Sequence, residues 1–472
     1  MKIIRNYLYN AGYQILVLIL PLITAPYASR VLKAYGTGIN AYTNSWIQYF
    51  ILFGSIGIAL YGNREIAYLR DDPKAVSKAF WEIQLLKTIT ILISCIAYAL
   101  FLQVYKQNHI YMVLQAVNLI AAAFDISWFY NGLEDFKHTA IRNTLVRIVS
   151  VILIFTLVRS QEDLGIYILI LGGSTLIGNL ALWPRLRKML VKVKINELRP
   201  FKHLHPTLVL FAPQIATQVY LVLNKTMLGS MVNTDAAGYY NFSDNLIKMV
   251  LALATSMSAV LMPRVSNEFS KGRNENINRF LYIAFDFVSF LSIAMWFGIA
   301  GISLHFGPYF YGPEYEPVGP AMLIESVIIV LIGWSNTTGL QYLMPVNRLK
   351  EFTTSVVLGA IVNIFLNVPL IYLWGLNGAM VATVLSEAVV TIYQLWVIRK
   401  DVELKQMFLN VPKYMIAGIV MFIPVFWINI NVHTSILTIF ADVALGIVIY
   451  IVMTLLLKPT IVDRIKGIIK NR

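Results

Sequence analysis

Long apolar runs recur from one end of this 472-residue chain to the other. A run of roughly 20 apolar residues forms a helix long enough to cross the hydrocarbon core of a bilayer. The sequence therefore predicts an all-α, polytopic membrane protein with about fourteen transmembrane helices. Their approximate bounds are 9–32, 41–66, 78–103, 109–130, 139–159, 164–184, 207–232, 237–263, 277–305, 318–343, 352–374, 377–398, 412–430 and 435–457.

Composition excludes several other classes of protein. Hydrophobic residues make up 58% of the chain and charged residues 13%, whereas an ordinary soluble domain carries about 25% charged residues. A single cysteine, Cys95, excludes an intramolecular disulfide, and the six histidines lack metal-ligand spacing. The sequence also lacks a phosphate-binding glycine loop, so we expect no built-in ATPase, no metal and no cofactor.

The net charge of +14 comes from basic residues in short connectors between the spans. With the N-terminus inside, inner connectors hold 30 of the 38 Lys and Arg residues, and outer connectors hold only four (Arg30, Lys33, Lys106 and Arg159). This bias follows the positive-inside rule and predicts that both termini are cytoplasmic, with no nucleic-acid partner. The most basic connector, Trp183–Pro206, carries seven Lys and Arg residues and one acid, Glu197. It serves as a topological anchor, and an ordinary solvated connector explains it equally well.

Two short matches suggest an internal repeat. Residues 38–44 resemble residues 238–244, and residues 132–134 resemble residues 339–341. Both matches occupy equivalent places in the order of spans, which favours two pseudo-symmetric six-helix lobes around a central cavity. The predicted domains are an N-terminal lobe (1–190), a basic connector (191–205), a C-terminal lobe (206–400) and two further spans (401–472).

Ionisable residues inside the spans are costly and usually face a bundle interior or water. Arg30 and Lys225 have no acid within one helical turn, and we favour a cavity role for them over snorkelling to the head groups. Lys248 lies four residues after Asp244, and a self-neutralising ion pair is the simpler reading of that spacing. The acids most able to bind a coupling Na⁺ or H⁺ in the C-terminal lobe are Asp244, Asp286, Glu325 and Glu387, although structural pairing also explains each.

Four stretches are informative in their order and spacing. They are SRVLKAYGTGINAYTNSW (29–46), GNREIAYLRDD (62–72), DISWFYNGLEDFKHTAIRN (125–143) and VLGAIVNIFLNVPLIYLWGLNGAMVATVLSE (357–387). Together they resemble Wzx-type (PST family) polysaccharide flippases of the superfamily that contains MATE exporters and lipid II flippases. The resemblance implies export of undecaprenyl-diphosphate-linked oligosaccharide repeat units from the inner to the outer leaflet of a bacterial plasma membrane, for capsule or another surface polysaccharide. It also implies that the last two spans line a groove for the lipid tail.

Such a substrate needs a polar cavity, because each unsatisfied sugar hydroxyl costs several kcal/mol in hydrocarbon. Cationic side chains would hold the diphosphate, for which the candidates are Arg30, Lys225 and Lys248. Amides and aromatic rings would meet the sugars, for which the candidates are Asn40, Tyr42, Asn44, Trp46, Gln214, Gln218, Asn224 and Tyr240.

Two other functions compete with a flippase. A cation-coupled multidrug exporter would need an acidic cavity, which Arg30 and Lys225 disfavour. A membrane enzyme that uses a polyprenyl sugar donor would usually need sizeable outer loops, and this chain has none long enough to fold separately. We therefore expect a transporter rather than an enzyme, with membrane lipids and the lipid-linked oligosaccharide as partners, and the prediction allows a polysaccharide polymerase as a further partner.

Overall fold

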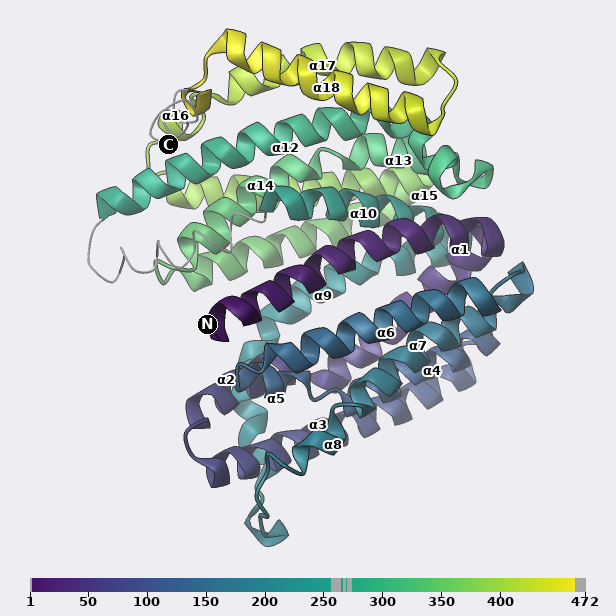
Figure 1. Ribbon diagram of the computed structural model, residues 1–472, viewed down its shortest axis with the longest axis vertical. Helices are drawn as coiled ribbons and strands as arrows, with labels where there is room; N and C mark the ends of the chain where they lie inside the picture. The colour runs from purple at the N-terminus through teal and green to yellow at the C-terminus, as the bar shows by residue number, and fades with distance from the viewer. Residues whose placement is uncertain (1, 256–264, 266–268, 270–273, 463–472) are drawn as a thin grey trace. The chain divides into compact units, whose positions relative to one another are not determined.

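The computed structural model consists of helices and short connectors (Figure 1). It describes all residues except 1, 256–264, 266–268, 270–273 and 463–472, and it leaves out the side chains of residues 2–18, 136–137, 212–214, 216–217, 220–221 and 274–276. None of the described residues lies in a β-strand, so the predicted all-α class is confirmed.

The chain forms two compact units, Met1–Gly229 and Ser230–Arg472. Helix α9, predicted as the first span of the second lobe, lies almost entirely in the first unit; the predicted lobe boundaries themselves stay a prediction. The first unit contains α1 (Lys2–Ser55), α2 (Ile58–Leu69), α3 (Pro73–Val104), α4 (His109–Phe124), α5 (Ser127–Gly132), α6 (Phe136–Leu157), η1 (Gln161–Asp163), α7 (Leu164–Leu180), α8 (Trp183–Leu186), η2 (Ile195–Glu197), η3 (Pro200–His203) and α9 (Leu204–Met231).

The second unit carries the last two predicted spans as α17 and α18. Its elements are α10 (Thr234–Thr255), α12 (Asn274–Tyr311), η4 (Pro313–Tyr315), α13 (Val318–Glu325), α14 (Ile328–Thr338), η5 (Gly339–Leu343), α15 (Leu349–Ile398), α16 (Leu404–Met407), α17 (Val411–Asn431) and α18 (Ile436–Leu457). Figure 1 shows α17 and α18 beside α12. The contact is close, because a Cβ on Gly418 would lie 2.2 Å from the ring of Phe297.

Two long helices each join two predicted spans through one residue. Helix α1 contains the predicted span 9–32 and the first part of the predicted span 41–66, which continues in α2, and α15 contains the predicted spans 352–374 and 377–398. The backbone of α1 turns at Lys33, where φ is 58°, and that of α15 turns at Gly375, where φ is 54°. The second turn requires glycine nearby as well, because a Cβ on Gly378 would lie 1.9 Å from the carbonyl oxygen of Leu370. The apolar runs therefore correspond to the two segments on either side of each kink. The sequence predicts loops between these segments, whereas the structure has tight reversals within a continuous helix.

Ten stretches of the described residues are long and apolar enough to span a membrane. Two of them, Ile19–Leu69 and Leu349–Ile398, contain the kinked helices and thus two predicted spans each. Helix α9 corresponds to the predicted span 207–232, and α10 to residues 237–255 of the predicted span 237–263, whose remaining residues lie outside the described ones. Neither helix is among the ten, and α10 carries Asp235, Asp244 and Lys248. Each predicted span thus corresponds to a helix, an arm of a kinked helix or a short series of helices.

Two predicted spans are interrupted by breaks between helices. The predicted span 109–130 is broken between α4 and α5, and the predicted span 318–343 is broken between α13 and α14. The matched tripeptides have different local structures, because residues 132–134 close α5 and form a turn whereas residues 339–341 open the π-helix η5. The internal repeat therefore stays a prediction.

Candidate functional site

A network of amide side chains joins α1 to α4 inside the first unit. The buried Gln115 donates from Nε2 to Asn40 Oδ1 at 3.3 Å and to Thr43 Oγ1 at 3.1 Å. Its Oε1 accepts from Asn118 at 2.7 Å and from Asn44 at 3.4 Å. The structure thus brings the predicted Asn40 and Asn44 together and adds Gln115 and Asn118, which the sequence analysis missed.

Aromatic rings lie next to this network. The Trp46 ring is centred 5.0 Å from that of Phe101, 5.6 Å from that of Tyr105 and 6.5 Å from that of Tyr42. The hydroxyls of Tyr42 and Tyr105 hydrogen-bond, and Tyr105 also donates to Gln107 Oε1 at 2.7 Å. The indole N–H of Trp46 is buried and has no hydrogen-bond partner among the described residues. The aromatic cluster therefore contains one hydrogen-bond donor, the Trp46 N–H, that has no acceptor among the described residues.

The end of α9 packs against the same part of α1. Thr226 donates to Ser45 Oγ at 2.9 Å, and a Cβ on Gly229 would lie 2.1 Å from the Tyr42 ring. Of the α9 residues predicted from the sequence, Asn224 is buried, Lys225 is half-buried and Gln218 is exposed, while the side chain of Gln214 lies outside the described residues. Arg30 is exposed and lies one helical turn before the kink of α1.

A charged cluster occupies the interior of the second unit. Lys248 Nζ pairs with Asp244 Oδ1 at 2.7 Å, and Ser243 donates to Glu325 Oε2 at 2.6 Å. Glu325 is fully buried, and its Oε1 has no hydrogen-bond partner among the described residues. Lys248 also interacts electrostatically with Glu325 and Glu387. Three of the four predicted coupling acids therefore surround one lysine.

The remaining predicted residues of the second unit have other partners. Asp286 accepts from Asn410 at 2.9 Å, from Tyr414 at 2.8 Å and from Thr460 at 3.2 Å, which ties α12 to the start of α17 and to the chain after α18. Tyr240 is buried, and its hydroxyl lies 3.3 Å from Thr383 Oγ1. These contacts are structural in character.

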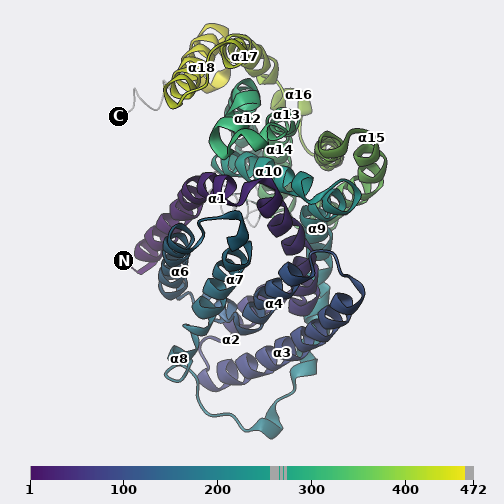
Figure 2. The same cartoon turned by 90° about the vertical axis from the view of Figure 1, so that its right-hand side faces the viewer.

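A polar cavity of about 360 Å³ lies among α1, α4, α6 and α7 in the first unit. Figure 2 shows the ribbons of these four helices. Two arginines of α6 line it, Arg142 and Arg147, with Asn118 and Asn143. Arg142 donates to Asn179 Oδ1 at 2.9 Å. Arg142 is among the 30 basic residues that the sequence assigns to inner connectors, whereas Arg147 lies within a long apolar run and was not predicted as a site residue. The sequence feature that could have revealed Arg147 is its position as a lone arginine in the middle of a predicted span.

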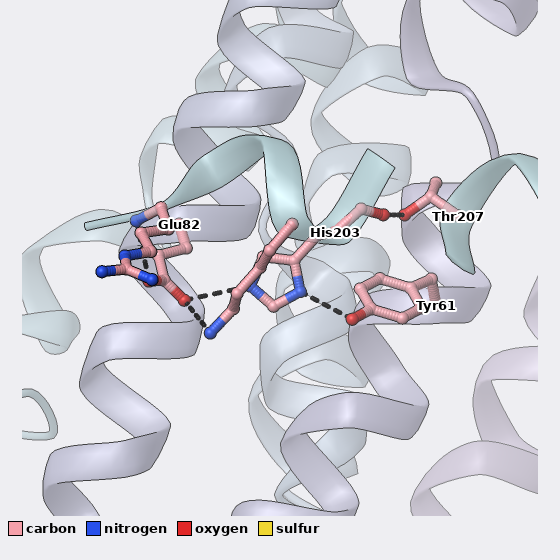
Figure 3. Close-up of polar contacts among 6 residues, drawn as sticks. Tyr61, Glu82, His203 and Thr207 are labelled. Carbon is pink, nitrogen blue, oxygen red and sulfur yellow. Dashed lines mark hydrogen bonds and ion pairs between the residues drawn. The ribbon is translucent and has the colours of Figure 1, made fainter. Parts of the chain in front are cut away.

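The basic connector is held by a buried glutamate (Figure 3). Glu82 of α3 accepts from Lys202 Nζ at 2.6 Å, from His203 Nε2 at 3.0 Å and from the backbone N–H of Arg199 at 2.8 Å. Tyr61 O–H lies 2.6 Å from His203 Nδ1 and donates to it when Nε2 carries the proton. Every polar atom of the Glu82 carboxylate and the His203 ring is thus satisfied.

Burial sets the protonation state of this histidine. Desolvation lowers the pKa of His203 below its usual value of 6.5, and this effect outweighs the hydrogen bond to Glu82, which raises it. His203 is therefore neutral at physiological pH and donates to Glu82 as the Nε2 tautomer. The connector is part of the packed first unit rather than only a solvated loop.

Comparisons with known proteins agree with one another. The family described as "Polysaccharide biosynthesis protein" matches residues 3–269. The putative O-antigen transporter of Escherichia coli (strain K12) is 23% identical over 407 residues, which cover 84% of this chain and 97% of that protein. Among solved structures, the lipid II flippase MurJ in an inward closed conformation is similar over 95% of this chain and 98% of its own, with a TM-score of 0.73 and 16% identity.

A MATE family multidrug resistance transporter in an inward-facing conformation is also similar. The match covers 81% of this chain and 98% of that one, with a TM-score of 0.57 and 13% identity. At these identities the two solved structures establish a shared fold. The chain therefore has the fold common to MurJ and MATE transporters.

Proposed function

Because the chain belongs to the polysaccharide biosynthesis protein family, we propose that it is a flippase for lipid-linked oligosaccharides. The substrate that we assign is an undecaprenyl-diphosphate-linked repeat unit, moved by alternating access from the inner to the outer leaflet of a bacterial plasma membrane. The product would be capsule or another surface polysaccharide, with a polysaccharide polymerase as a possible protein partner. This proposal assigns no catalytic residue.

The observation that carries the proposal is the amide and aromatic cluster of the first unit. Sugar hydroxyls need donors and acceptors, and sugar ring faces pack on aromatic side chains. Asn40 and Asn44 supply amides, while Trp46 supplies an aromatic face and a buried indole N–H that lacks a partner among the described residues. This chemistry, held inside helices of membrane-spanning length, suits a sugar in transit better than an organic cation.

The diphosphate assignment to Arg30, Lys225 and Lys248 continues as a proposal. The ion pair with Asp244 uses part of the charge of Lys248, so Arg30 and Lys225 are the first two to test. Alanine at either residue should abolish polysaccharide export at normal membrane abundance, and Lys225→Arg should retain part of it. Normal export by the double alanine variant would remove both residues from the substrate site.

We further propose that Na⁺ or H⁺ couples to transport at Glu325 and Asp244. A buried carboxylate oxygen without a donor is costly, and binding of a proton or cation would relieve that cost. Glu325 Oε1 is such an oxygen, whereas Asp286 accepts hydrogen bonds from Asn410, Tyr414 and Thr460. We therefore leave Asp286 out of the coupling site and keep Glu387 as a neighbour of the shared lysine.

Complementation of a strain that lacks its own flippase tests the transport proposal. Wild-type protein should restore surface polysaccharide, and Trp46→Ala should lower it at least fivefold while lipid-linked oligosaccharide accumulates in cells. Trp374→Ala is the matched control, because that indole is 58% exposed on α15 and lies outside the last two spans, which the family resemblance assigns to the lipid tail. Restored ethidium efflux without restored polysaccharide would instead support the MATE-like alternative.

Both termini are assigned to the cytoplasm on the basic-residue bias alone. In a Cys95-free background, cysteine at the exposed Glu314 should react with an impermeant reagent from outside. Cysteine at the exposed Lys194 should react only after the membrane is permeabilised. The opposite labelling pattern would contradict this topology.

A further inference from the structure

We propose that the polar cavity between α1, α4, α6 and α7 binds the diphosphate group of a polyprenyl-linked substrate through Arg147 and Arg142. The identity of the ligand rests on the proposed function, whereas the anion site rests on the cavity itself. The site is separate from the Arg30 and Lys225 pair, and the sequence analysis did not include it.

Arg147 lies too deep to reach the membrane surface. It is eleven residues from Phe136 and ten from Leu157, the two ends of α6. At about 1.5 Å per residue, either end is roughly 15 Å away along the helix axis, farther than an arginine side chain extends. Arg147 forms no hydrogen bond or ion pair with any residue that the structure describes, and it lines the cavity. A guanidinium at this depth is stable only if an anion or water meets it there.

The surroundings of the cavity carry excess positive charge. Asp125 is the nearby acid, and it interacts electrostatically with both Lys87 and Arg142. Lys87 is buried and donates to the backbone carbonyl of Asp125 at 2.6 Å. Asp125 is thus balanced by two cations, Lys87 and Arg142, while the cavity lining itself holds Arg142 and Arg147 and no acid among the described residues. The lining from α1, α4 and α7 adds only uncharged side chains, including Thr24, Asn118 and Thr175.

The cavity fits a diphosphate better than a single small anion. Arg142 and Arg147 are five residues apart, so their backbones are about 7.5 Å apart along α6. Each guanidinium can bind two phosphate oxygens in a fork, and together they suit neighbouring phosphates. A volume of about 360 Å³ leaves space for more than the phosphates. The amide side chains of Asn118 and Asn143 also line the cavity, where they can hydrogen-bond to the bound diphosphate.

An apolar groove adjoins the cavity and shares Arg142 and Val146 with it. This groove, of about 380 Å³, runs between α6 and α7 and is lined by apolar side chains that include Leu145, Val149 and Ile177. Within the bilayer, such a groove gives an isoprenoid chain close van der Waals packing in place of lipid acyl chains. One ligand with a diphosphate next to an isoprenoid chain would match both linings, whereas inorganic pyrophosphate would use only one.

Native mass spectrometry of the full-length protein in detergent micelles tests this inference, with undecaprenyl diphosphate, undecaprenol, inorganic pyrophosphate and phosphatidylglycerol as probes. Wild-type protein should bind undecaprenyl diphosphate most tightly. Arg147→Ala should weaken that binding at least tenfold and leave undecaprenol binding unchanged. Arg147→Lys should recover part of the loss. Arg159→Ala is the matched control, because Arg159 is an exposed arginine that lies just after the C-terminal end of α6.

Folding should not confuse the result, because Arg147 contributes no described hydrogen bond or ion pair. Equal binding of undecaprenyl diphosphate by wild-type protein and Arg147→Ala would overturn the inference. Phosphatidylglycerol binding that is as tight and as dependent on Arg147 would also overturn it, since the site would then be an ordinary lipid site.

An export assay in parallel separates this inference from the proposed function. Lost binding with normal polysaccharide export by Arg147→Ala would overturn only the assignment of this site to the transported substrate. Failure of the wild-type protein to restore export would contradict the flippase proposal and would leave the measured anion site standing.

Discussion

Glu82 in the first unit and Glu325 in the second are both fully buried, yet their surroundings differ. Glu82 has donors on both oxygens, including a lysine ammonium, a histidine N–H and a backbone N–H. Glu325 accepts from Ser243 on one oxygen, while its second oxygen has no hydrogen-bond donor among the described residues and the carboxylate of Asp244 lies beside it. A carboxylate whose two oxygens both accept hydrogen bonds favours one permanent arrangement, whereas a carboxylate oxygen without a hydrogen bond favours reversible binding of a proton or cation. The same residue type thus serves structure in one unit and, as we propose, coupling in the other.

The largest expected effect is that of Glu82→Ala. This change leaves the buried His203 N–H and the Arg199 N–H without an acceptor, and breaking a buried pair in this way costs about 3 kcal/mol. Equilibrium unfolding in mixed micelles should show the loss in the free energy of unfolding. The exposed Glu197→Ala in the same connector is the control and should change it little. A loss below about 1 kcal/mol for Glu82→Ala would remove the contrast between the two glutamates.

Glu325→Gln should separate folding from transport. The amide keeps the shape of the side chain and imitates a permanently protonated carboxyl, so membrane abundance should stay near wild type. We expect export to fall about tenfold, or about 1.4 kcal/mol in the barrier, and to lose its dependence on pH. Glu316→Gln, an exposed acid of the same unit, serves as the control. Wild-type export by Glu325→Gln would show that this carboxylate is structural too.

Acid should weaken the Glu82 cluster through His203. The pKa of folded His203 lies below its unfolded value of 6.5, so the folded state binds fewer protons in this range. The resulting stability is complete above pH 6.5 and falls as the pH drops below 6.5 towards the folded pKa. We expect stability to fall between pH 7.5 and pH 5.5, by no more than about 1.4 kcal/mol because this range extends one unit below 6.5, and the same unfolding assay measures the loss. His203→Gln should flatten this slope, and the exposed His205→Gln should preserve it; an unchanged slope in His203→Gln would assign it to another group.

The smallest expected effect is that of Tyr61→Phe. It removes the hydroxyl that donates to His203 Nδ1 and leaves that nitrogen buried without a donor. The expected loss in the free energy of unfolding is about 1 kcal/mol or slightly less, because a neutral hydrogen bond contributes that much. Tyr68→Phe is a suitable control, since Tyr68 is exposed on the same helix. A loss as large as that of Glu82→Ala would mean that the hydroxyl, and not the carboxylate, organises the cluster.

The fold could be predicted from the sequence because apolar length alone identifies a membrane helix. The reversals at Lys33 and Gly375 could not, since each depends on a single backbone conformation inside a continuous helical pattern. The break between α4 and α5 was hidden in the same way. Helix periodicity therefore indicates the arms of the fold and says little about the points where they bend.

The candidate site was predicted only where its residues lie close together in the chain. Asn40, Tyr42, Asn44 and Trp46 share two turns of α1, and the structure places them in one polar and aromatic region. Glu82 was missed because its partners lie more than one hundred residues away, in a connector that reads as solvated. Arg147 was missed because a single charge barely changes the average of a long apolar run.

The attachment of the connector to Glu82 also affects how the protein is made. His203 follows Glu82 by 121 residues, so at roughly 5–20 residues per second the glutamate is synthesised about 6 to 24 s before its histidine. During that interval α3 has to carry a carboxylate that lacks its final donors. The nascent first unit therefore completes its packing only after the ribosome has passed residue 203, and any shorter fragment of it would expose an unmet charge to the quality-control proteases of the membrane.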